Sequence, residues 1–144
     1  MLVYTIGYEG ETIENWINRL LQAGITVLVD IREKPISRKK GFSKSALKNY
    51  LEKHNIEYTH YRSLGSPSDI RKQLMNDFNY DVFFEKYEKH LAAQDDLLKE
   101  IITTYENERP CFMCFEKNHR RCHRHSVAKR LEEIYPERVR VVHL

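Results

Sequence analysis

The feature that most constrains the fold of this chain is the regular alternation of short apolar runs with longer amphipathic stretches. Five apolar runs have the length and composition of strands: residues 2–6, 25–31, 56–61, 110–115 and 139–144. Between them, apolar residues recur at the spacing of one helix face, most clearly at Ile13, Trp16, Ile17 and Leu20. Strands that alternate with helices over short connections predict an α/β fold, with a mostly parallel sheet of about five strands and helices on both faces.

Length and composition set further bounds. A chain of 144 residues fits one compact domain, and no repeat or interdomain linker divides residues 1–144. The mean hydropathy is −0.66, and no apolar run approaches the roughly 20 residues that a membrane helix needs. The first residues lack the basic and small-residue features of a secretory signal. We therefore expect a cytoplasmic protein without a membrane partner, whose three cysteines are reduced thiols rather than a disulfide framework.

Local signals place several helix ends. Thr12 is predicted to cap the first helix, and Gly24 stands where a helix ends in a left-handed residue. Ser43 is the predicted cap of a second helix, and residues 66–69 are predicted to form a loop.

The charge distribution is strongly uneven along the chain. Residues 30–48 carry a net charge of +5 and residues 109–130 a net charge of +6, whereas residues 77–108 carry −6. If the two basic segments fold together, they form a positive surface that attracts phosphates. An anionic small molecule or a nucleic acid is the expected partner; the alternative for each run is an ordinary solvated face.

Reactive residue types gather where the predicted strands end. Gly7 and Tyr8 follow the first strand, Asp30 and Arg32 end the second, and Cys114 begins a polar segment after the fourth. Parallel strands end at one edge of the sheet, which is where ligands of α/β proteins bind. We therefore expect a site at this edge. The alternative for Asp30 and Arg32 is that they pair with each other to satisfy a buried strand end.

A helix is predicted to begin at Cys122 or His123, and its start combines free backbone N–H groups with Arg120, Arg121 and Arg124. Cations at a helix N-terminus are unfavourable unless a negative group is bound there. The same cations would also enrich the thiolate form of Cys122. Cys122 is thus a candidate nucleophile; the alternative is a half-buried thiol that packs against the helix.

The cysteines and histidines of residues 111–125 also suggest zinc. Cys111 and Cys114 lie within one predicted strand, where positions three apart point to opposite faces, so Cys111 is expected to be a buried apolar residue. We predict no metal, and zinc held by Cys114, Cys122 and one histidine is the alternative. The Cys-x5-Arg spacing of Cys114 and Arg120 lacks the glycines of a phosphate-binding loop and is interpreted as accidental.

Several segments together resemble the domain-of-unknown-function 488 family of small bacterial and archaeal α/β proteins. They are Thr5-Ile6-Gly7-Tyr8, Val29-Asp30-Ile31-Arg32, Pro35, Ser37-Arg38, Gly41-Phe42-Ser43, Leu64-Gly65, and Cys114-x-Glu116 with Cys122-His123-Arg124. The resemblance spans nearly the whole chain and implies a single three-layer α/β domain. A fainter similarity, to rhodanese-like domains, rests on Asp30-Ile31-Arg32-Glu33 and Arg124-x-Ser126 and implies a Rossmann-like or rhodanese-like layer order.

These observations and the resemblance give one predicted site. Its predicted catalytic residues are Cys114, Glu116, Cys122 and His123. Its predicted substrate-binding residues are Gly7, Tyr8, Asp30, Arg32, Arg38, Phe42, Ser43 and Arg124. The function we expect is an enzyme acting on an anionic, phosphate- or nucleotide-bearing substrate without a cofactor. The alternative is a nucleic-acid-binding module without its own catalysis. In such a module, exposed lysine and arginine side chains contact phosphates, and aromatic rings stack on nucleobases.

Overall fold

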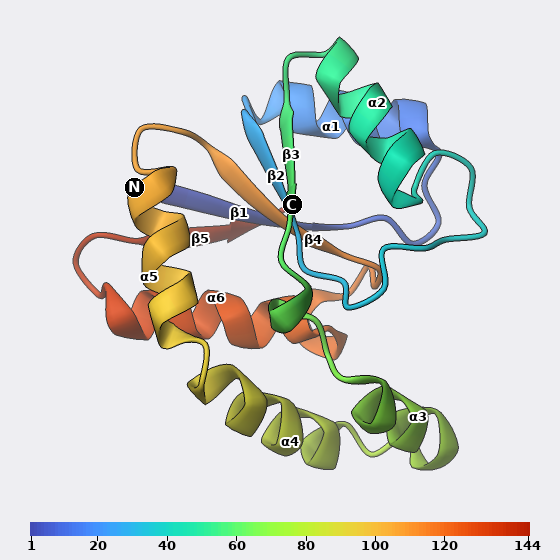
Figure 1. Ribbon diagram of the computed structural model, residues 1–144, viewed down its shortest axis with the longest axis vertical. Helices are drawn as coiled ribbons and strands as arrows, with labels where there is room; N and C mark the ends of the chain where they lie inside the picture. The colour runs from blue at the N-terminus through green and yellow to red at the C-terminus, as the bar shows by residue number, and fades with distance from the viewer.

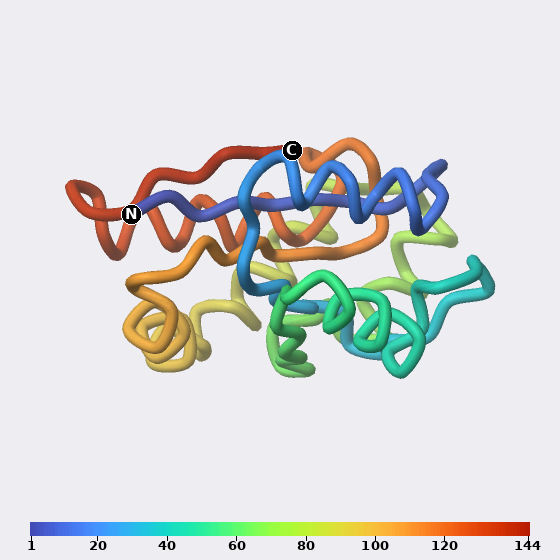
Figure 2. The backbone as a smooth tube through the Cα atoms, turned by 90° about the horizontal axis from the view of Figure 1, so that it is seen from above, coloured from blue at the N-terminus to red at the C-terminus, as the bar shows by residue number.

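The computed structural model describes all of residues 1–144, and its centre is one sheet of five strands. The strands are β1 (Leu2–Gly7), β2 (Val27–Asp30), β3 (Glu57–His60), β4 (Pro110–Cys114) and β5 (Arg140–His143). Every neighbouring pair is parallel, and the order across the sheet is β3-β2-β4-β1-β5. Seen from above, β1 and β5 run side by side in the same direction (Figure 2). The predicted five-stranded parallel sheet is confirmed.

Helices cover both faces of this sheet. They are α1 (Ile13–Gln22), α2 (Lys44–Lys53), α3 (Ser68–Asp77), α4 (Tyr80–Ala92), α5 (Asp95–Thr104) and α6 (His123–Ile134), with short 3-10 turns at Arg62–Leu64 and His119–Arg121. Apolar residues of α1 and α2 pack on one face, and those of α4, α5 and α6 pack on the other. Figure 1 shows α3 and α4 together at one end of the molecule, away from α1 and α2. The three-layer α/β architecture is therefore the predicted one.

The alternation of side chains along each strand divides the core into two layers. In β4, Cys111 and Met113 join the layer under α1 and α2, whereas Phe112 and Cys114 join the layer under α4, α5 and α6. Successive residues of a strand point to opposite faces, so this division follows from the strand itself. Cys111 is fully buried on the face opposite to Cys114, as the sequence predicted.

The helix ends agree with the sequence in part. The Thr12 hydroxyl accepts a hydrogen bond from the Asn15 N–H, and Gly24 has a φ of 71°, so both predicted roles are confirmed. Ser43 does precede α2, but its hydroxyl exchanges hydrogen bonds with the backbone of Ser37 instead of capping the helix. The predicted loop at residues 66–69 is wrong in its second half, because α3 already begins at Ser68.

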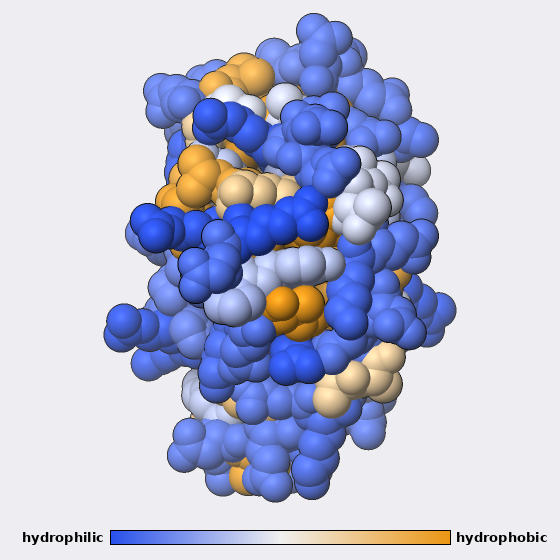
Figure 3. All heavy atoms as spheres, turned by 90° about the vertical axis from the view of Figure 1, so that its left-hand side faces the viewer, coloured by the Kyte–Doolittle hydropathy of each residue, from blue (hydrophilic) through white to orange (hydrophobic).

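The side of the molecule that carries the N-terminus and α5 shows mainly hydrophilic side chains, interrupted by small separate hydrophobic areas (Figure 3). None of the helices combines the length and the apolar composition required to cross a membrane.

Candidate active site at the carboxyl edge of the sheet

The topology of the sheet creates a crevice beside β4. The helix that follows β4 is α6, on one face, whereas the helices that follow its neighbours β1 and β2 are α1 and α2, on the other face. The helices that follow these strands therefore lie on opposite faces, and such a point in a parallel α/β sheet is where ligands bind. Sequence reasoning predicted the edge but not which pair of strands would open.

A cleft of about 220 Å³ lies at this edge. Five of the predicted site residues line it: Tyr8, Arg32, Cys114, Glu116 and His123. They come from the ends of β1, β2 and β4 and from the start of α6. The convergence of these segments in one cleft is the geometry that the parallel sheet predicted.

The cleft also contains two basic residues that the sequence did not assign to the site. Lys34 follows β2 and Arg71 lies on α3, and both line the cleft. Lys34 belongs to the basic run at residues 30–48, so charge was its only signal. No sequence signal marked Arg71, because α3 comes near the ends of β2 and β4 only in the folded structure.

Asp30 and Arg32 form a buried ion pair below the cleft. The guanidinium donates to both carboxylate oxygens of Asp30, at 2.9 Å from Nε to Oδ1 and 2.8 Å from Nη2 to Oδ2. Its Nη1 donates to the Tyr8 hydroxyl and to the Phe42 carbonyl. The neighbouring Asp30 raises the pKa of Arg32 against the effect of burial. Asp30 and Arg32 therefore pair with each other at the buried strand end, which was the alternative to a substrate-binding role. The same guanidinium holds the Tyr8 hydroxyl at the cleft wall.

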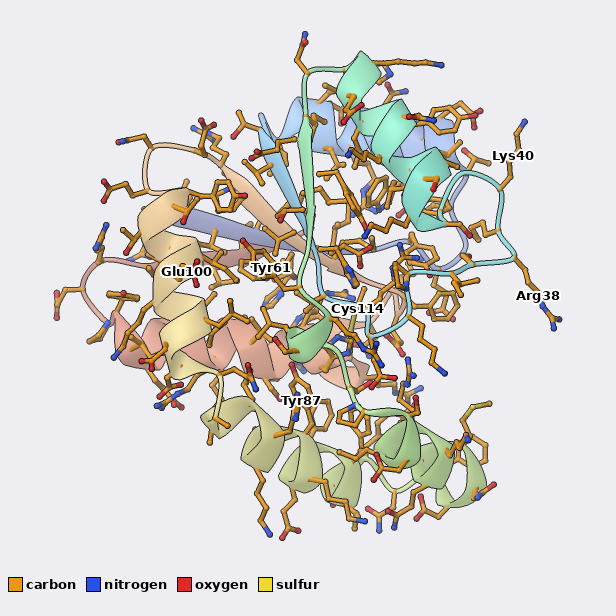
Figure 4. All side chains as sticks on the ribbon, in the orientation of Figure 1. Arg38, Lys40, Tyr61, Tyr87, Glu100 and Cys114 are labelled. Carbon is orange, nitrogen blue, oxygen red and sulfur yellow. A yellow bond between two sulfur atoms is a disulfide. The ribbon has the colours of Figure 1, made fainter.

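Phe42 supports the same wall, whereas Ser43 and Arg38 do not reach it. The Phe42 ring stacks on the Tyr8 ring with 4.5 Å between centroids. The Ser43 hydroxyl is used within the loop by Ser37. Figure 4 shows Arg38 pointing away from the molecule into solvent, far from the labelled Cys114. A substrate-binding role of Arg38 would need a ligand that extends beyond the cleft.

Cys114 and Cys122 are joined as a disulfide, and Cys111 is the remaining free cysteine. The expectation of three reduced thiols is thus wrong for this pair. It failed because the eight residues between Cys114 and Cys122 fold back through the turn at His119–Arg121, which no local pattern revealed. Both cysteines are almost fully buried, with Cys114 at the floor of the cleft.

Arg124 is a fully buried cation whose charge is not paired with a carboxylate. Its Nη1 donates to the Glu116 carbonyl and lies 3.4 Å from the Cys114 Sγ, and its Nη2 donates to the Lys117 carbonyl at 3.1 Å. Burial lowers its pKa to about 10. The structure thus gives Arg124 carbonyl and sulfur contacts, and an anion shared with Arg120 and Arg121 stays a prediction.

Glu116 places a carboxyl group next to the sulfur atom. Its Oε2 lies 3.6 Å from the Cys114 Sγ, and burial raises its pKa. The backbone of Glu116 crosses directly over Gly7, where an added Cβ would lie 1.9 Å from the Glu116 carbonyl oxygen. Gly7 therefore contributes by allowing the segments after β1 and β4 to approach each other.

His123 is held as a neutral imidazole. Its Nε2 donates to the Ile31 carbonyl at 2.7 Å, which leaves Nδ1 as the acceptor, 4.0 Å from the Cys122 Sγ. Burial lowers the pKa of His123 to about 4. Cys114, Cys122 and His123 have potential metal-ligand atoms within 4.8 Å of one another. Joined sulfurs offer no pair of thiolates, so zinc at this place would require the reduced cysteines.

The site is therefore that of an α/β domain with a disulfide-linked cysteine pair beside a carboxyl group, a neutral histidine and a buried arginine. The family model described as Domain of unknown function DUF488 matches residues 12–131. The chain belongs to this family, as the resemblance of its motifs indicated. No curated protein and no solved structure matches the chain.

Proposed function

We propose that this protein is an enzyme that acts on an anionic substrate in the cleft at the carboxyl edge, with Cys114 and Cys122 as its reactive groups. One observation carries the proposal: the two sulfur atoms meet beside Glu116 and Arg124, and Cys114 and Glu116 line a cleft that also contains Lys34. A protein that only binds phosphate has little need for a thiol pair, a carboxyl group and an imidazole in one place.

Two cations support binding of a phosphate- or nucleotide-type group. Lys34 is exposed and forms no ion pair. Arg71 uses Nη2 for Glu33 and Ser68, which leaves its other N–H groups for a ligand. An anion between these side chains would lie next to Cys114, because all of them line the same cleft.

In the first step, the reduced Cys114 thiolate attacks an electrophilic sulfur atom of the anionic substrate, such as a sulfur of a disulfide or an S-sulfonate. A bond from Sγ to that atom forms, and the bond to the leaving group breaks. Arg124 Nη1, 3.4 Å from Sγ, stabilises the thiolate, and the carboxyl group of Glu116 gives its proton to the leaving group. The raised pKa of Glu116 favours the protonated form that this step uses.

In the second step, Cys122 resolves the covalent intermediate. The thiol gives its proton to His123 Nδ1, and the thiolate attacks the Cys114 Sγ. A disulfide forms, the bond from Cys114 to the substrate breaks, and its electron pair leaves with the substrate, which is thereby reduced by two electrons. Two molecules of a small thiol, or one dithiol, then reduce the disulfide again.

Alkylation of the reduced protein tests this proposal without knowledge of the substrate. Iodoacetate and iodoacetamide react with thiolates in the same way but differ in charge. The rate ratio of iodoacetate to iodoacetamide at Cys114, followed by mass spectrometry, should exceed the ratio for free cysteine by about tenfold, the lower range of electrostatic steering. Lys34→Ala and Arg71→Ala should each lower the ratio, whereas Lys48→Ala, on α2 outside the cleft, should not. A ratio equal to that of free cysteine refutes the proposal that the cleft binds anions.

Exposed basic side chains give one observation in favour of a second candidate function, nucleic-acid binding. Arg38 and Lys40 extend into solvent from the loop before α2 (Figure 4). The second basic segment does not extend this surface uniformly, because Arg109 contacts Tyr4, Arg124 is buried and Arg130 pairs with Asp95. Binding of oligonucleotides that weakens steeply with salt would favour this candidate; binding that is absent at low salt excludes it.

A further inference from the structure

A second cluster of reactive side chains lies outside the cleft. His119 of the turn before α6, His125 of α6 and His143 of β5 have potential ligand atoms within 4.8 Å of one another. None of the three lines the cleft that contains Cys114. We propose that His119, His125 and His143 form a binding site for a divalent transition-metal ion of the zinc type.

The spacing of the imidazoles fits one ion. His119 Nδ1 and His125 Nδ1 are 3.0 Å apart. Two nitrogens bound to one tetrahedral zinc ion, each at about 2.0–2.1 Å, lie about 3.3 Å from each other. In the absence of an ion, one Nδ1 at this distance donates a hydrogen bond to the other. The ring of His143 stacks on that of His119 with 3.7 Å between centroids, so the third imidazole lies alongside and needs to tilt out of the stack to share the ion.

The third imidazole is oriented by a buried hydroxyl. Thr5 pairs with His143 across β1 and β5, and its Oγ1 lies 2.6 Å from His143 Nδ1. When Nδ1 donates to this hydroxyl, Nε2 presents its lone pair. Metal-bound histidines almost always have their second ring nitrogen held by such a partner. Thr5 is 1% exposed, so its hydroxyl finds few other partners.

The surroundings leave room for an ion and for a fourth ligand. A cleft of about 350 Å³ is lined by His125 and His143 together with Glu132 and Glu133. Three histidines with one open position is the ligand set of catalytic zinc sites, and imidazole also suits nickel, copper and cobalt. Positive charge on the nearby Arg124 and on Lys129 of the cleft opposes the ion. The two glutamates offset it in part, since Glu133 also pairs with Arg130.

Titration of the protein with Zn²⁺ and Co²⁺ tests this site. We expect one equivalent of each metal to bind to protein that carries no histidine tag and has been freed of metal with a chelator. Calorimetry should show loss of this binding in His143→Gln and in His125→Gln. The exposed His54 serves as the matched control, and His54→Gln should bind as the unmodified protein does. Thr5→Val should weaken binding about tenfold, the lower range for partners of metal ligands.

The absorption of bound Co²⁺ identifies the ligands directly. Histidine ligands alone give no thiolate-to-cobalt charge-transfer band, and Cys114→Ser should leave the spectrum unchanged. Circular dichroism verifies that each variant is folded. Absence of binding overturns the proposal, as does binding that persists in His143→Gln, or a charge-transfer band that Cys114→Ser removes.

Discussion

Replacement of Gly7 by alanine tests whether the segments after β1 and β4 meet as described. The new Cβ would lie 1.9 Å from the Glu116 carbonyl oxygen and 2.9 Å from Arg124 Nη1. The first of these atoms belongs to the backbone, so the strand ends must separate. Overpacking costs about 1–3 kcal/mol, and we expect Gly7→Ala to lower the free energy of unfolding by about 3 kcal/mol.

Gly10 provides the matched control for this substitution. It has a φ of 77°, and nothing lies within 4 Å of an added Cβ. Gly10→Ala should therefore cost only the strain of a left-handed residue, about 1 kcal/mol. Urea unfolding can be followed by the fluorescence of Trp16, whose indole N–H donates to the Gly7 carbonyl. If Gly7→Ala is no less stable than Gly10→Ala, the close approach of Gly7 to Glu116 is refuted.

Three other substitutions or conditions give separate outcomes. Arg124→Met should slow alkylation of Cys114 in the reduced protein at least about tenfold at pH 7, because a cation 3.4 Å from Sγ is lost; an unchanged rate contradicts this. Asp30→Asn should lower the free energy of unfolding by about 3–5 kcal/mol, measured in urea, because Arg32 keeps a buried charge without its counter-ion; a loss below about 1 kcal/mol argues against the pair. The pKa of His123 is lowered from 6.5 to about 4, so stability should be complete above pH 6.5 and fall by about 3 kcal/mol toward pH 4, as the unfolded chain takes up the proton first. His123→Gln should remove the part of this pH dependence that His123 causes and leave the part due to His143, whose pKa burial also lowers to about 4; urea midpoints with the same pH dependence as the unmodified protein would show that His123 does not contribute.

The parts of the fold that depend on local pattern were predictable. The apolar face of α1 and the alternation within β4 follow from helix and strand periods, so the three layers and the opposite orientation of Cys111 and Cys114 could be deduced. The edge that carries the site could also be deduced, because parallel strands end on one side.

The parts that depend on distant contacts were not predictable. His143 meets Thr5 only through the register of β5 on β1, and the two residues are 138 positions apart. The burial of Arg124 depends on backbone carbonyl groups of the segment after β4. The hydrophobic pattern of a sequence does not predict where backbone carbonyl groups of a loop point. The sequence marked Arg124 as basic, but a basic residue at a helix start is ordinarily exposed.

Mapping of the disulfide in mildly oxidised protein tests most directly that Cys114 and Cys122 form a reversible pair at the carboxyl edge of the sheet. Trypsin leaves Cys111 and Cys114 in one peptide and Cys122 in another, since Lys117 and Arg121 separate them. Fragment-ion sequencing of the non-reduced digest should show a bond between Cys114 and Cys122 that a small thiol reverses, with Cys111 free. A bond that includes Cys111, or a pair that stays reduced under oxidation, would contradict the thiol pair at the carboxyl edge.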